Sequence, residues 1–398
     1  MLRFLLVSAV VFLAFNVIAC WQLMRLHPRR KPAVIAIPVI CNLMWLFFPI
    51  LNARTDFSRA VRAILGPPWF GWLCFITIYC AFLLLIYVFY VAQTPLSVRT
   101  GKSAGATQFS RFARWPSRIF LWSSIVLLIA GLYTALMPLD IERVPITLDN
   151  LPPELNGTRI ALIADLHTGL FTRPSRLRQI FATTASLSPD IVLLAGDLVD
   201  DDPYFVSKLL DSTHVLPPTL PLVGVLGNHE MYGQPFEVIR RLRGSRVHLL
   251  VNEGTALKGF WFAGLSDYAA SIDALKPNFE LALAQKPADA FPIVVAHQPR
   301  AFPDAQKRAL PLTLCAHSHG GQLGFRPLGW SLAGLFLPYH MGLYRRGGSQ
   351  VYVNTGTGYW LLPWRLGLMP EITLVELRRS EKFSVKSIVH HRGTESTE

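Results

Sequence analysis

The stretch Ile191-Val192-Leu193-Leu194-Ala195-Gly196-Asp197-Leu198-Val199-Asp200 decides how the C-terminal part of this 398-residue chain folds. Five consecutive apolar residues bounded by aspartate and glycine are typical of a short strand that is buried on both faces. The segment after the strand is explained equally well by a surface turn or by a loop that presents Asp197 for chemistry. The apolar run therefore predicts a central strand.

Four more short apolar runs end in a similar way after residue 157. The runs are residues 160–164, 222–226, 293–296 and 312–315. The polar residues that follow them are Asp165, Asn228, His297 and His317. Amphipathic stretches separate the runs, so the pattern indicates alternating strands and helices. Because binding sites in such folds gather at the carboxyl ends of strands, we expect these residues to converge.

Each polar motif alone also has a structural explanation. Asp165-Leu166-His167 is compatible with a helix N-cap followed by a surface histidine. Gly227-Asn228-His229-Glu230 contributes little to packing, and the glycines after His319 indicate that the chain curls there. Together the motifs supply carboxylate, imidazole and amide ligands without a thiolate, a set suited to Mn²⁺, Fe or Zn²⁺. A bridging carboxylate can hold two such ions about 3.5 to 4 Å apart.

The order of the motifs is D-x-H, G-D-x-x-D, G-N-H-E, a lone histidine and H-x-H-G-G, and it resembles the calcineurin-like metallophosphoesterase family. It looks most like the membrane-associated bacterial branch of transmembrane proteins with a metallophosphoesterase domain, because H-x-H-G-G-Q falls at 317–322 and P-E-I-T-L at 370–374. The resemblance covers about residues 155–378. It implies an α/β fold, a four-layer α/β/β/α sandwich, and hydrolysis of a phosphomonoester, phosphodiester or pyrophosphate by metal-activated water. The family usually has glycine where this chain has Ala316, and we expect only a slight change in packing.

The resemblance also implies a role for each matching residue. One metal ion would be held by Asp165, His167, Asp197 and His319. Asp197 would bridge to a second ion, whose other ligands would be Asn228, His297 and His317. His229 would stabilise developing charge or protonate the leaving oxygen, and Asp200 would orient it. Asp267, after a further predicted strand, is explained by a supporting role near the metals or by the capping of a turn.

The N-terminal third of the chain differs in kind. Four apolar stretches of about spanning length lie at residues 4–24, 33–51, 70–91 and 119–137. Pro38 and Pro49 interrupt the second, and a cleaved signal peptide is the alternative for the first. No charged residue lies inside the stretches, which favours an anchor over a transporter. The sequence thus predicts about four transmembrane helices at 1–138, a linker at 139–156, a metallophosphoesterase domain at 157–380 and a C-terminal tail at 381–398.

The charge distribution argues against a nucleic-acid partner. The formal net charge is +13, but residues 1–138 contain 13 Lys and Arg against one acid, Asp56, whereas the remainder has 25 against 24. The excess lies in loops between apolar stretches, where basic residues orient spans and meet anionic headgroups. The loop charges predict a multi-pass cell-membrane protein whose catalytic domain faces the extracytoplasmic side.

Two apolar clusters in the C-terminal part indicate a substrate class. One runs over residues 325–344 and precedes Arg345 and Arg346; the other surrounds Trp360 and Trp364, with Arg365 beside it. Ordinary core packing explains both clusters, and so does a loop that dips into the headgroup region of a bilayer. The second explanation predicts a lipid or glycolipid phosphate as substrate, and the family resemblance includes enzymes acting on UDP-diacylglucosamine. The rival class is a metal-binding sensor or scaffold on a membrane anchor, which needs the ligands but not His229.

Overall fold

The computed structural model describes residues 2–26, 28–42, 55–93, 104–360 and 363–380. The chain divides into two compact units, Met1–Tyr133 and Thr134–Glu398. The predicted tail, 381–398, lies outside the described residues, and so do residues 43–51 of the second predicted span.

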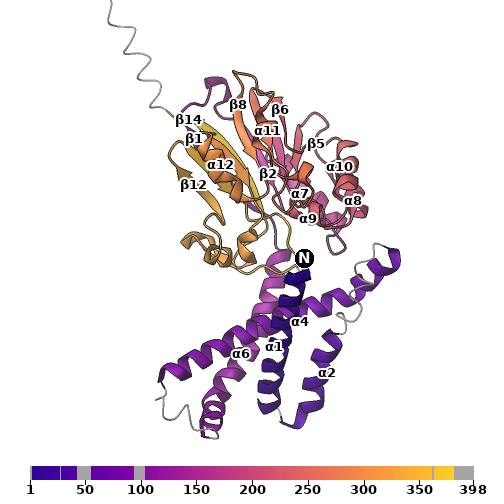
Figure 1. The fold of residues 1–398 in the computed structure, drawn as a ribbon, viewed down its shortest axis with the longest axis vertical. Helices are drawn as coiled ribbons and strands as arrows, with labels where there is room; N and C mark the ends of the chain where they lie inside the picture. The colour runs from indigo at the N-terminus through magenta and orange to yellow at the C-terminus, as the bar shows by residue number, and fades with distance from the viewer. Residues whose placement is uncertain (1, 27, 43–54, 94–103, 361–362, 381–398) are drawn as a thin grey trace, which may run out of the picture. The chain divides into compact units, whose positions relative to one another are not determined.

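The first unit is helical (Figure 1). Its elements are α1 (Leu2–Leu26), η1 (Pro28–Arg30), α2 (Lys31–Asn42), α4 (Asp56–Gln93) and α6 (Ala104–Leu136). By length and composition, α4 and the Phe112–Leu136 part of α6 can each cross a membrane, whereas Val10–Arg25 and Lys31–Ile40 are apolar but shorter. An N-terminal apolar helical region is therefore present, and the figure of four spans stays a prediction.

Polar side chains inside this unit pair with one another across helices. Gln22 donates from Nε2 to the Ser117 hydroxyl at 2.8 Å, and Trp72 donates from Nε1 to the Asn16 amide oxygen at 2.8 Å. Hydrogen bonds of this kind hold helices together where no water competes. These polar residues thus serve helix packing.

The described residues of the second unit form two six-stranded mixed sheets and one two-stranded ribbon. The first sheet has the order β1-β14-β2-β3-β4-β5, with bounds Asp140–Leu148, Glu371–Arg379, Arg159–Ile163, Ile191–Ala195, Leu222–Val225 and His248–Leu250. The second has the order β12-β13-β9-β8-β7-β6, with bounds Gly342–Arg346, Ser349–Val353, Leu312–Cys315, Phe291–Val295, Phe260–Gly264 and Glu253–Leu257. The ribbon pairs β10 (Gly324–Phe325) with β11 (Trp330–Ser331). Within the sheets, β2 to β5 run parallel, as do β7, β8, β9 and β13, and the five predicted strands are β2, β3, β4, β8 and β9.

Alternating strand residues pack on opposite faces of each sheet, as the two-residue period of a strand requires. Ile160 of β2 and Ile293 of β8 belong to one buried cluster that draws on both sheets. The other face of the first sheet, including Ala161, packs with α7 (Pro174–Ser186), α8 (Val206–Thr213) and α10 (Pro235–Arg243). The other face of the second sheet packs with α11 (Phe279–Leu283) and α12 (Phe302–Lys307). Helices therefore cover the outer faces of two sheets that share an inner core (Figure 1).

The stretch 139–156, expected to be a linker, contains β1. All nine residues of β1 pair in parallel with β14, and Val144, Ile146 and Leu148 point into the buried core. Pro145 lacks a backbone donor, but β1 is the edge strand of its sheet and can tolerate it. The chain thus adds a strand to the domain as soon as it leaves α6.

Short helical turns complete the second unit. They are η3 (Pro153–Leu155), η4 (Pro203–Phe205), α9 (Asn228–Tyr232), η5 (Asp273–Leu275), η6 (Pro299–Ala301), η7 (His319–Gln322), η8 (Arg326–Leu328) and η9 (Leu332–Leu335). Two of them, α9 and η7, begin directly at predicted site residues. The positive φ angles of Gly320 and Gly321 curl the chain after β9 has ended, as the glycines indicated.

Candidate metal centre

The loops after β2 and β3 continue side by side beyond their strands. The backbone N–H of Asp165 donates to Gly196 O, and that of His167 donates to Asp197 O, both at 3.0 Å. Asp165, His167 and Asp197 are all buried. Because adjacent parallel strands end at the same edge, these bonds bring the three side chains to one point.

Asp197 lies at the centre of the cluster. Its Oδ2 is 3.1 Å from His297 Nε2 and 3.7 Å from His167 Nε2, and its Oδ1 accepts the backbone N–H of His229 at 2.9 Å. Burial alone would raise the pKa of this carboxyl, but the imidazoles of His297 and His229 hold the pKa well below its usual range. An ionised carboxylate therefore faces histidines on both sides.

The predicted ligands form two groups, and a third group links them through His167 and Asp197. The possible ligand atoms of Asp165, His167 and His319 lie within 4.8 Å of one another, and so do those of Asp197, His297 and His317. His167, Asp197 and His229 form a third such group between them. Asn228 joins the second group, because its Oδ1 lies 3.1 Å from His297 Nε2. The structure thus brings together every residue that the motifs singled out as a ligand.

The surroundings of His297 indicate which ring nitrogen is free. Its Nδ1 lies 2.8 Å from Ala195 O, a partner that can only accept, so Nδ1 carries the proton of a neutral ring. In this tautomer the unprotonated Nε2 faces the oxygen lone pairs of Asp197 Oδ2 and Asn228 Oδ1, both at 3.1 Å, and lies 3.2 Å from His317 Nδ1. Burial alone would lower the pKa of His297, but Asp197 and Asp165 raise it well above its ordinary value. Either a proton on Nε2 or a metal ion in its place relieves the repulsion between these lone pairs. This donor set fits a metal ion.

The same residues carry an unusual backbone. Asp165, His167, Asp197, His317 and His319 all have φ between +42° and +75°. Non-glycine residues in the left-handed region cost about 1 kcal/mol or more each and cluster at functional sites. Asp and His tolerate this region better than β-branched residues, so the residue types suit both the backbone and the chemistry.

Two glycines are required by the close approach of these loops. A Cβ on Gly227 would lie 2.2 Å from Asp197 Oδ1, and one on Gly196, at φ +84°, would lie 2.7 Å from His297 Nδ1. Ala316, where the family usually has glycine, is fully buried and belongs to the core shared by the two sheets. Its methyl group is therefore accommodated at this position.

His229 lies at the rim of the cluster and not inside it. Its side chain is 16% exposed, and its ring contacts those of His167, Tyr232 and Trp360. Burial lowers the pKa of His229 below its ordinary value. Asp200 Oδ1 is 3.9 Å from His229 Nδ1 but only 3.1 Å from His167 Nδ1, so its hydrogen bond is with His167.

Asp267 caps a turn. Its Oδ1 accepts the backbone N–H of Ala269 at 2.7 Å and the Gln298 side-chain amide at 2.8 Å. Its Oδ2 is buried and has no hydrogen-bond partner among the described residues. The carboxylate thus caps the turn and holds Gln298, which follows His297 in the chain, and a role near the metals stays a prediction.

Glu230 is a site residue that the sequence analysis did not single out. The buried carboxylate accepts the backbone N–H groups of Asp197, Val199 and Gly227 at 3.1, 2.9 and 2.6 Å. It therefore ties the loop after β3 to the loop after β4. The sequence contained a signal for this role, because a glutamate three residues after a helix N-cap has the spacing of a capping box.

For Arg365 the structure favours core packing, one of the two explanations of its apolar cluster. Its side chain is fully buried behind His319, with Nη2 at 3.3 Å from His319 Nδ1. The guanidinium donates to the backbone oxygens of Thr355, Gly356 and Gly358 at 2.7 to 2.9 Å. Arg365 therefore stabilises the loop that passes behind Asp165, whose carbonyl accepts the N–H of Gly358 at 3.0 Å.

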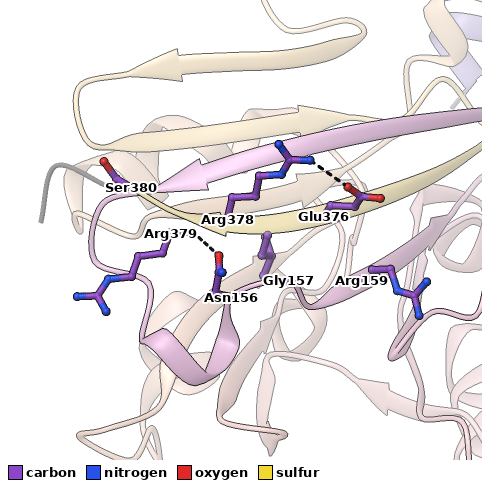
Figure 2. A pocket seen from close by; sticks show the side chains of 8 residues that line it. Asn156, Gly157, Arg159, Glu376, Arg378, Arg379 and Ser380 are labelled. Carbon is purple, nitrogen blue, oxygen red and sulfur yellow. Dashed lines mark hydrogen bonds and ion pairs between the residues drawn. The ribbon is translucent and has the colours of Figure 1, made fainter. Parts of the chain in front are cut away.

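A cavity of about 610 Å³ lies at the opposite edge of the first sheet (Figure 2). It is lined where β2 begins and β14 ends, by Arg159, Glu376, Arg378 and Arg379 among others. Arg378 and Glu376 pair with each other at 3.4 Å. The cavity is separate from the candidate metal centre, which lies where β2 ends.

Two facing mixed sheets whose strand ends carry this cluster define a metallophosphoesterase domain, and residues 158–321 belong to the family described as calcineurin-like phosphoesterase. The family predicted from the order of the motifs is thereby confirmed. The chain is 33% identical over 273 residues to a transmembrane protein with metallophosphoesterase domain from Danio rerio, with 64% of this chain and 61% of that protein covered.

Bacterial relatives show the same kinship. An uncharacterized metallophosphoesterase of Helicobacter pylori is 32% identical over 250 residues, with 62% of this chain and 66% of that protein covered. The phosphodiesterase YaeI of Escherichia coli is 28% identical over 228 residues, with 55% of this chain and 82% of that protein covered. The match thus spans 61% of the Danio rerio protein and 66% of the Helicobacter pylori protein.

Proposed function

We propose that this chain is a membrane-anchored, metal-dependent phosphohydrolase with a dinuclear centre bridged by Asp197. The observation that carries the proposal is the position of the Asp197 carboxylate, which faces His297 on one side and His167 on the other. Asp165, His167, Asp197 and His319 would hold one ion, and Asp197, Asn228, His297 and His317 the other. The nitrogen and oxygen ligands suit Mn²⁺, Fe or Zn²⁺.

When bound, the two ions would supply a hydroxide nucleophile and neutralise charge on the phosphoryl oxygens. The protein holds the ligand rings in place for this task. Asp200 accepts a hydrogen bond from His167 Nδ1 and Ala195 O accepts one from His297 Nδ1, so each ring presents Nε2 to the cluster. His229, at the rim, would donate a proton to the leaving oxygen or stabilise its charge.

The test is turnover by the purified full-length chain after chelation and stepwise addition of Mn²⁺. Phosphomonoester, phosphodiester and pyrophosphate substrates are assayed in parallel, and bound metal is counted by elemental analysis. Two ions per chain together with metal-dependent turnover are expected. Tight metal binding without turnover of any substrate would favour the sensor or scaffold and overturn the proposal.

For the substrate we propose a phosphate ester carried by a lipid or glycolipid, with UDP-diacylglucosamine as one concrete candidate. Two helices of spanning length support this proposal, because a tethered domain meets bilayer substrates at high effective concentration. Turnover of a vesicle-borne phospholipid or UDP-diacylglucosamine is compared with that of a soluble aryl phosphate. A strong preference for the soluble ester would contradict the lipid assignment.

We further propose that the domain faces the extracytoplasmic side. The loop charges support this orientation, since basic residues concentrate in cytoplasmic loops. A C-terminal alkaline phosphatase fusion, which is active only outside the cytoplasm, should be active. If a fusion to green fluorescent protein fluoresces while the phosphatase fusion is inactive, the domain faces the cytoplasm and the proposed orientation is wrong.

A further inference from the structure

Three rings surround the side chain of His229, the proposed proton donor. Between ring centroids, His167 lies 4.6 Å away, Tyr232 5.3 Å and Trp360 6.4 Å, and each meets the imidazole in an edge contact. His167 is a buried member of the candidate metal centre, whereas Tyr232 and Trp360 are 55% and 41% exposed. A group bonded to the leaving oxygen would therefore pass His229 and meet these two exposed rings.

Tyr232 is held by the turn that carries a predicted metal ligand. It is the last residue of α9, which begins at Asn228, and its hydroxyl accepts a hydrogen bond from Asn228 Nδ2 at 3.2 Å. The other end of the same amide, Oδ1, faces His297. A single asparagine side chain thus joins Tyr232 to the metal centre, so the ring lies at a fixed place although half of it faces water.

Trp360 is held by a different turn of the metal centre. Gln322 bonds to its backbone at two points, because Gln322 Oε1 accepts the Trp360 N–H at 2.9 Å and Gln322 Nε2 donates to Trp360 O at 3.3 Å. Gln322 is the last residue of η7, the turn that begins at the predicted ligand His319. The backbone that carries the Trp360 ring is therefore tied to the same centre as Tyr232.

Core packing does not explain why these two positions carry aromatic residues. Aromatic side chains that serve the core of this domain are fully buried, as Phe181 and Phe260 are. Tyrosine and tryptophan at exposed, fixed positions offer a flat surface that binds another ring at a small cost in entropy. Sites for small molecules are commonly lined by such rings, with a few polar groups that set orientation. The two rings therefore favour a ligand that has a flat ring of its own.

We propose that Tyr232 and Trp360 form a subsite for the leaving group and select substrates whose leaving alcohol carries a flat unsaturated ring. A nucleoside and an aryl alcohol share this chemistry. The proposal rests on the proposed function, because it takes His229 to be the group that meets the leaving oxygen. It adds a preference among phosphate esters that the metal ligands by themselves cannot supply.

The test measures binding by the full-length, Mn²⁺-loaded chain in detergent, using titration calorimetry. Benzylphosphonate resembles an aryl phosphate with a methylene group in place of the leaving oxygen, and cyclohexylmethylphosphonate has the same skeleton with a puckered, saturated ring. A nucleoside phosphonate and the same sugar phosphonate without its base form a second pair. The flat-ring member of at least one pair should bind several-fold more tightly, and the pair that shows the preference distinguishes an aryl from a nucleoside leaving group.

Replacement of either ring should reduce this preference. Tyr232→Leu and Trp360→Leu should each lower the ratio of the two affinities by roughly 3-fold, the effect of losing one aromatic contact. Tyr232→Phe should keep the ratio, because it keeps the ring and loses only the hydroxyl. Trp330→Leu is the matched control, because Trp330 is 45% exposed on β11, and its ratio should equal that of the wild type.

Failure of this inference and failure of the proposed function are distinguishable. Metal-dependent turnover without a preference in either pair, or a preference that survives both leucine variants, overturns the subsite and leaves the function intact. Equal weakening of both members of a pair shows that the rings are only structural and also overturns it, as does the absence of any phosphonate binding. A preference that depends on the two rings, without turnover of any ester, supports the subsite and overturns the function.

Discussion

His167 Nδ1 lies 3.1 Å from Asp200 Oδ1, and the same carboxylate oxygen is 3.9 Å from His229 Nδ1. A carboxylate behind a ligating histidine fixes the ring and raises its basicity. We therefore expect Asp200→Asn to weaken metal binding by roughly 10- to 100-fold. Competition with a fluorescent chelator measures the change, and Asp211→Asn on α8 is the control. Unchanged metal affinity with reduced turnover would show that Asp200 acts on His229 and not on the metal ligand His167.

Replacement of Asp197 by alanine should remove both ions. The carboxylate faces both ligand groups, so its loss dismantles the centre and does not merely weaken one site. Elemental analysis should find less than one ion per chain, and turnover should fall to background. Circular dichroism checks that the fold persists. Wild-type turnover of this variant after chelation and Mn²⁺ addition would refute the bridging role.

His229→Ala should separate metal binding from chemistry. The ring lies at the rim of the cluster, and only its backbone N–H contacts Asp197 within hydrogen-bonding distance. Both ions should stay bound, while turnover of substrates with a poor leaving group falls by roughly 10²- to 10⁴-fold. Esters with an acidic phenol as leaving group should be affected much less. Loss of metal together with activity would instead make His229 a ligand.

Arg365→Met should destabilise the domain. The change leaves the carbonyls of Thr355 and Gly358 without their Arg365 donor, at a cost of about 1–3 kcal/mol for each unsatisfied group, whereas Gly356 O keeps the backbone N–H of Glu371. Thermal unfolding should show a clear drop in Tm, and Arg365→Lys should recover only part of it, because lysine lacks the fork of donors. A lysine variant as stable as the wild type would show that charge alone suffices.

Glu371 should give the domain an acid-sensitive component of stability. Burial alone would raise the pKa of this carboxyl, but Arg326 and hydrogen bonds from Thr355, Thr373 and Tyr352 lower it below its ordinary value. A group with a lowered folded-state pKa stabilises above its unfolded pKa and loses that contribution as pH falls through the folded pKa. Glu371→Gln should therefore lower Tm at pH 7, and the difference from wild type should shrink below about pH 4.5. A difference that stays constant from pH 7 to pH 3 would contradict this.

Local sequence sufficed for the five strands that end at the ligand motifs. β3 and β9 have the predicted bounds, because a short uninterrupted apolar run between turn residues has few alternatives to a buried strand. The convergence of Asp165, Asn228, His297 and His317 could also be expected, since parallel strands end at a common edge. The Pro145-containing strand β1 was missed, because its partner β14 lies more than two hundred residues further along the chain.

Tertiary structure alone decided which side chains touch and which face water. His167 and His319 are 152 residues apart, yet their Nε2 atoms lie 3.1 Å from each other. Likewise, Arg365 and Phe336 both belong to apolar stretches, but Arg365 is fully buried and Phe336 is 79% exposed. Residue type fixes what a side chain can donate, accept or exclude, whereas its partner and its burial depend on the register of distant strands and on the packing above them.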